Sequence, residues 1–132
     1  DRSVSRGLGD VYKRQLLIKK ENKMNKKVLS PGQIIELRKY ISNPEKYMHL
    51  LDLMNAFPVL WYTEKGYTTN EDEAVFNSPL YFQIIKGDEW WQAVYMDIRD
   101  GGEIEKISKK HKEVIDAVFD IFLWICKNKI IS

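Results

Sequence analysis

The chain has 132 residues, of which 44% are hydrophobic and 12% aromatic, and a formal net charge of +2. The aromatic content excludes a disordered chain, and the single cysteine, Cys126, excludes an intramolecular disulfide and a cysteine-based zinc cage. The most apolar stretch, residues 117–126, is about half the ~20 residues that a membrane-spanning helix needs. We therefore expect a cytoplasmic protein without a membrane segment.

Residues 1–23 have the character of a leader rather than of a folded segment. The string "VSRGLGDVYKRQ" resembles a translated sequencing adapter that recurs at the ends of fragmentary metagenomic genes. Lys20 and Glu21 can be encoded by a purine-rich ribosome-binding site ahead of Met24. We expect residues 1–23 to be non-native or disordered, and 24–132 to form a single domain. The alternative is a disordered basic arm that binds an anionic partner.

Most of the positive charge belongs to this leader. Residues 1–23 hold seven basic and three acidic side chains, whereas residues 24–132 hold 14 basic and 16 acidic ones. A nucleic-acid-binding domain is expected to show a basic footprint in its folded part. Nucleic acid is therefore an improbable partner on charge alone, although a local basic patch remains compatible with this balance.

Two helices are predicted at the start of the domain. Ser30, Pro31 and Gln33 have the spacing of a capping box with proline in the first turn. The sequence Asn43–Glu45 repeats this pattern, and Pro58 ends the second helix because proline disfavours helical geometry in the residue before it. The pattern predicts a helical hairpin.

A short β-hairpin and a short helix are expected next. Residues 59–63 and 67–69 are rich in β-forming side chains, and Gly66 is suited to a left-handed position in the loop between them. Asn70 is spaced as a cap for a short helix over residues 71–77.

Residues 80–86 and 89–98 are the best candidates for strands. Gly87 and Asp88 between them suit a two-residue turn, which would place Lys86 opposite Glu89. Alternation divides the second strand into two faces, which are both largely apolar: Trp91, Ala93 and Tyr95 on one, and Trp90, Val94, Met96 and Ile98 on the other. This pattern predicts a central strand covered on both sides.

A final helix is predicted from a cap at Ser108 to about Lys129, with His111 at the start of its core-facing stripe. Together the elements predict an α+β fold. The N-terminal helical hairpin and the C-terminal helix would pack on a small antiparallel sheet of three to four strands.

The candidates for catalysis and metal binding are few. His49 and His111 have no sequence-local acid and nucleophile arranged as in a catalytic triad. Cys126 lies on an apolar helix stripe, which favours a buried and inert thiol. The carboxylates in residues 97–105 surround a glycine turn, but their spacing does not match a calcium-binding loop. We expect no enzyme, and no catalytic, cofactor-binding or metal-binding residues.

Trp124 is the strongest candidate for contact with a partner. Helical spacing places it among charged residues such as Asp120, next to the apolar Leu123. An exposed tryptophan of this kind could anchor a protein partner or a second copy of the chain. The alternative is that the first helical hairpin covers it.

A second candidate is nucleic-acid contact through the cluster Lys106, Lys109, Lys110 and Lys112. Such a cluster is more often a solvated helix start. Trp90 and Trp91 resemble a stacking platform, but the neighbouring Asp88 and Glu89 would repel phosphate. This alternative requires an exposed aromatic residue next to the lysines.

Three stretches of residues 59–126 form a pattern of a short helix, two strands and a closing helix: "GYTTNEDEAVF", "LYFQIIKGDEWWQAVYMD" and "EVIDAVFDIFLWIC". By this pattern residues 59–126 resemble the phage-encoded ABA-sandwich family, whose function is unknown. The resemblance implies a phage or prophage origin and no activity. We therefore expect a small non-enzymatic accessory or interaction protein of bacterial or phage origin, acting by protein contacts or self-association.

Overall fold

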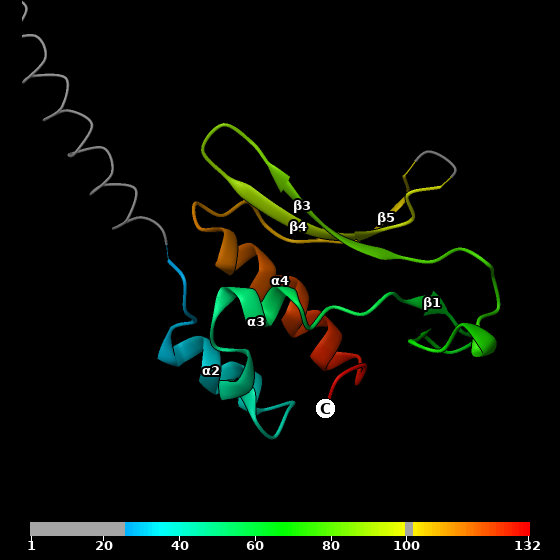
Figure 1. The fold of residues 1–132 in the computed structure, drawn as a ribbon, viewed down its shortest axis with the longest axis horizontal. Coiled ribbons are helices and arrows are strands. Elements are labelled where there is room, and N and C mark those ends of the chain that lie inside the picture. Colours follow the sequence, from blue (N-terminus) through cyan, green and yellow to red (C-terminus); the bar gives the residue numbers. More distant parts are fainter. Residues whose placement is uncertain (1–25, 100–101) are drawn as a thin grey trace, which may run out of the picture.

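The computed structural model describes residues 26–99 and 102–132, which fold into a mixture of helices and strands (Figure 1). The predicted leader, residues 1–23, lies outside the described residues. Within the described residues the helices are α2 (Pro31–Arg38), α3 (Leu50–Met54) and α4 (Val114–Lys127), with two 3-10 helices, η1 (Pro44–Tyr47) and η2 (Glu71–Glu73). The strands are β1 (Trp61–Tyr62), β2 (Tyr67–Thr68), β3 (Tyr81–Lys86), β4 (Trp91–Met96) and β5 (Ile104–Ile107).

The strands form a two-stranded sheet, β1–β2, and a three-stranded antiparallel sheet in the order β3–β4–β5. The central position of β4 confirms the prediction. Figure 1 shows α2, α3 and α4 on one side of the three-stranded sheet, where α4 packs directly against β4. The described helices therefore cover one face of β4. On the other face Val94 has no exposed surface, so the centre of β4 is buried on both sides, in agreement with the predicted cover.

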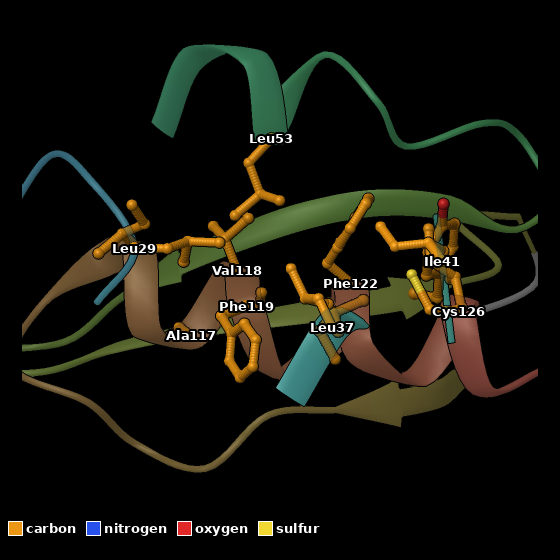
Figure 2. Packing of buried hydrophobic residues seen from close by; sticks show 14 of the residues in the cluster. Leu29, Leu37, Ile41, Leu53, Ala117, Val118, Phe119, Phe122 and Cys126 are labelled. Atoms are coloured by element: carbon orange, nitrogen blue, oxygen red, sulfur yellow. The ribbon is translucent and has the colours of Figure 1, made fainter. Parts of the chain in front are cut away.

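Helix α4 supplies a larger share of the core than any other described element. Its wide apolar stripe includes Ile115, Phe122 and Ile125, which have no exposed surface. Tyr95 packs against this stripe from β4, and Leu53 points toward α4 from α3 (Figure 2). Burial of large side chains of this kind contributes about 1.5–3 kcal/mol each, so that α4 is the main stabilising element.

The start of α2 confirms the predicted capping box. The Ser30 Oγ accepts a hydrogen bond from the Gln33 backbone N–H, and the Gln33 side chain accepts one from the Ser30 N–H. These two bonds satisfy backbone donors that a helix start leaves free.

The predicted second helix is broken into η1 and α3, so the helical hairpin is not confirmed. Val28 and His49 form an isolated antiparallel bridge that interrupts the helical path. The Leu50 N–H donates to the carbonyl of Lys27 over 2.9 Å instead of to a helical partner. The helical periodicity of the sequence carries no information about this pairing with a distant segment.

The turns differ from the predicted ones. Lys86 pairs with Trp91 instead of Glu89, because the Gly87 N–H donates to the Trp90 carbonyl and closes a longer loop. Gly66 lies outside the left-handed region. The predicted helix over residues 71–77 is limited to η2.

The segment before α4 belongs to the sheet and not to the helix. The Ser108 hydroxyl accepts a hydrogen bond from the Ala93 N–H over 2.9 Å, and His111 forms a backbone bridge with Trp91. Strand β5, which the sequence did not predict, leads into this segment. Helix α4 accordingly begins at Val114, and both the predicted cap at Ser108 and the helical placement of His111 are wrong.

Candidate interaction surfaces

The face of the β3–β4–β5 sheet opposite the helices is uncharged and largely apolar. The register places on it eight residues, here called the open sheet face: Tyr81, Gln83, Ile85, Gln92, Val94, Met96, Ile104 and Ile107. Ile104 and Ile107 on β5 are 51% and 42% exposed, so the described residues leave both partly uncovered, whereas Val94 at the centre of the face has no exposed surface. A sheet face without charge is unusual for a surface that only meets water.

The size of the open sheet face can be compared with known contact surfaces. Three strands about 4.8 Å apart, with about 3.3 Å per residue, give this face an area on the order of 300 Å². Contiguous apolar patches of a few hundred Å² often mark interaction sites. A stable interface buries about 800 Å² per partner, so the face would form the apolar centre of a larger contact.

Trp124 is half-buried and packed against other aromatic rings. Its ring centroid lies 5.1 Å from that of Tyr67 and 5.8 Å from that of Tyr95. The β1–β2 hairpin, through Tyr67, therefore lies against Trp124, and this cover was not among the alternatives that the sequence suggested. Leu123 is also half-buried against the core. The partner contact through these two residues stays a prediction.

Asp120, the third residue of the predicted partner interface, is engaged within the chain. Its Oδ2 lies 2.7 Å from His111 Nε2 and accepts a hydrogen bond from the Lys109 N–H over 3.4 Å. These contacts fix the segment between β5 and α4 onto the first turns of the helix. The spacing of the sequence placed Asp120 on the wet side of α4, and the structure gives this residue a structural partner there.

The lysine cluster is divided between two elements. Lys106 lies on β5, whereas Lys109, Lys110 and Lys112 lie in the segment before α4. The ammonium group of Lys110 lies 4.6 Å from the ring centroid of the half-buried Trp90. The structure thus brings a partly exposed aromatic ring next to two of the four lysines, Lys110 and Lys112.

Glu105 forms a second polar cluster, which the sequence did not predict. The hydroxyl groups of Tyr62 and Tyr67 both donate to its carboxylate, one to each oxygen. Burial and these hydrogen bonds raise the pKa of both tyrosines above the ordinary value. The contacts hold the β1–β2 hairpin against β5, and no spacing in the sequence signals them because the partners lie far apart along the chain.

The residues considered for catalysis are not brought together. His49 is exposed at the start of α3, whereas His111 contacts Asp120 beside the sheet. Cys126 is buried, and burial raises the pKa of its thiol to about 12, which keeps the sulfur protonated and unreactive. Within residues 26–99 and 102–132, no three metal-ligating side chains are grouped as a cation site.

The described part of the chain contains no helix with the length and apolar character needed to cross a bilayer. No family model, curated protein or solved structure matches the chain. The resemblance to the phage-encoded family therefore stays a prediction.

Proposed function

We propose that the chain is a small non-enzymatic interaction protein that acts by protein contacts through the open sheet face, in the first place with a second copy of itself. One observation carries this proposal: Ile104 and Ile107 are exposed on an uncharged sheet face that the described helices leave uncovered. Removing apolar surface from water is favourable by about 25 cal/mol per Å², so this face gains free energy when another surface covers it.

A second copy has suitable chemistry for this face. The eight residues of the open sheet face carry no charge, so they provide no electrostatic selection for a basic or an acidic partner. Two such faces related by a two-fold axis would each bury the isoleucines of the other. Sheet-on-sheet packing of this kind, about 10 Å between sheets, is a common way to complete a core.

The test is the concentration dependence of the molecular mass. Sedimentation of the full chain from micromolar to millimolar concentration should show a mass that rises above the monomer value. The double variant Ile104→Lys/Ile107→Lys should remain monomeric over the same range, because two charges would be desolvated at the centre of the contact.

The matched control is Ile35→Lys, which changes an exposed isoleucine of α2 on the other side of the molecule. This variant should associate like the unchanged chain. A chain that stays monomeric throughout, or a double variant that associates as strongly as the control, would remove self-association through this face. The bacterial or phage origin expected from the sequence remains part of the proposal.

A further inference from the structure

The loop that joins β3 and β4 forms a hollow against the segment before α4. The hollow has a volume of about 510 Å³ and is lined by Lys86, Gly87, Asp88, Glu89, Trp90, Trp91 and Lys112. Gly87 is needed for its shape, since a methyl group at this position would overlap the indole of Trp90. Two indole rings thus contribute to one concave surface, although they come from consecutive residues, because Trp90 belongs to the loop and Trp91 to β4.

Both indoles have an ammonium group nearby. Lys110 Nζ lies 4.6 Å from the Trp90 ring centroid, and Lys86 Nζ lies 5.2 Å from that of Trp91. Lys112 lines the same hollow. Ring faces and mobile cations side by side are the two components of single-strand recognition, in which bases stack on aromatic rings and lysines follow the backbone.

We propose that this hollow binds single-stranded nucleic acid, with a base stacked on Trp90 and phosphate groups held by Lys110 and Lys112. In the free protein the Lys110 ammonium lies near the ring of Trp90. A bound base takes its place on the ring, and the ammonium moves to the adjacent phosphate. The proposal is independent of the open sheet face, which contributes no residue to the hollow.

The two carboxylates in the hollow add a preference among bases. Asp88 and Glu89 lower its positive charge, which weakens the attraction of the hollow for a phosphate backbone. Carboxylate oxygens accept hydrogen bonds from the exocyclic amino group of cytosine, which thymine lacks. The full chain should therefore bind an oligodeoxycytidylate more tightly than an oligothymidylate of the same length.

The first experiment is a salt titration of binding, measured by fluorescence anisotropy with these two labelled oligonucleotides. The variant Lys110→Gln/Lys112→Gln should bind more weakly and reduce the slope of log K against log salt by about 1.4, since each single-strand phosphate contact contributes about 0.7. The control Lys46→Gln/Lys127→Gln removes the same charge from two lysines that lie over Tyr47 and Tyr40, away from the hollow.

Both double variants have the same net charge. A difference between them therefore measures the contribution of the lysines at the hollow and not a general effect of positive charge. Equal affinity and equal salt slopes for the two would overturn the proposal. So would undetectable binding of both oligonucleotides by the unchanged chain at low salt.

The second experiment tests the stacked base. Trp90→Leu should lower the affinity about tenfold or more, and Trp90→Phe should recover part of the loss, because stacking on an aromatic ring contributes about 1–3 kcal/mol per base. If Trp90→Leu does not fold, the lysine variants decide the proposal on their own. Equal binding of the leucine variant and the unchanged chain would exclude the stacked base.

Discussion

Asp116, in the first turn of α4, connects this helix to α2 and to the segment that precedes α2. Its Oδ1 accepts hydrogen bonds from Lys26 Nζ and from Gln33 Nε2, both over 2.8 Å. Burial alone would raise the pKa of this carboxyl group, but the two hydrogen bonds together with the nearby charges, chiefly that of Lys26, outweigh it and hold the pKa below its ordinary value. The unfolded chain therefore binds a proton at higher pH than the folded one, so this contribution to stability is lost as the solution is acidified.

The variant Asp116→Asn should lower the free energy of unfolding by about 1–2 kcal/mol at neutral pH, because hydrogen bonds to a charged group are lost. The difference from the unchanged chain should shrink below about pH 4, where the carboxylate of the unfolded chain becomes protonated. Urea unfolding at pH 7 and pH 3 measures both effects. A constant difference between these pH values would show that the charge of Asp116 is not responsible.

Glu105 affects the stability of the fold at high pH, as Asp116 does at low pH. Because the pKa values of Tyr62 and Tyr67 are raised in the folded state, the unfolded chain releases their protons first. The free energy of unfolding should therefore fall as the pH rises above about 10, the ordinary value for tyrosine. Burial also raises the pKa of Tyr95, which adds to the same fall.

Glu105→Gln removes the negative charge next to the two phenols. This change should lower stability at pH 7 by about 1–3 kcal/mol, because both hydroxyls lose a charged acceptor. It should also make the fall above pH 10 less steep, while Tyr95 contributes equally in both proteins. Unfolding followed by circular dichroism from pH 7 to 11 tests this, and parallel pH profiles would contradict the role given to the carboxylate.

At the level of single residues, the sequence predicted those features whose partners lie close together along the chain or on one helix stripe. The capping pair Ser30 and Gln33 and the buried thiol of Cys126 followed from spacing alone. Glu105 did not, because its two tyrosines come from another hairpin. Nucleic-acid contact requires an aromatic ring next to the lysines. The sequence alone could not show whether this is so, because the position of the Trp90 ring depends on how its loop folds.

Among the secondary-structure elements, α3 depends most on its surroundings. A helix of five residues is too short to be stable alone, so packing must hold it in place. Leu53 is the member of α3 that has no exposed surface, and it points toward α4 (Figure 2). Leu51, two positions before it, is 69% exposed.

These two leucines provide a matched pair of substitutions. Leu53→Ala should lower the free energy of unfolding by about 2–5 kcal/mol, because it leaves a cavity against α4. Leu51→Ala should change it by about 0.5 kcal/mol or less. Denaturant unfolding of both variants is the measurement, and similar losses would show that α3 does not pack as described.

The two helix boundaries that the sequence misplaced share one cause. The break after η1 comes from the bridge between Val28 and His49, and the late start of α4 comes from the bridge between Trp91 and His111. Both are backbone pairings between distant segments. Helical periodicity describes one segment at a time, so it extended the predicted helices through both bridges.

At the scale of the whole molecule, alternation in β4 correctly indicated two apolar faces and a central strand. It could not show what covers each face, because a strand residue is hydrophobic whether the surface that covers it belongs to the same chain or to a partner. The described helices lie on one side, and Val94 on the other side has no exposed surface while Ile104 and Ile107 remain exposed. The asymmetry between the face covered by helices and the face with these two exposed isoleucines is the basis of the proposed function.

The most direct test of this asymmetry is the solvent accessibility of individual isoleucine methyl groups at a concentration where the chain is monomeric. A soluble paramagnetic agent should strongly broaden the NMR signals of Ile104 and Ile107, and leave those of Ile115, Ile121 and Ile125 in α4 sharp. Protection of Ile104 and Ile107 equal to that of the helix isoleucines would contradict an open sheet face, and the proposed function would fall with it.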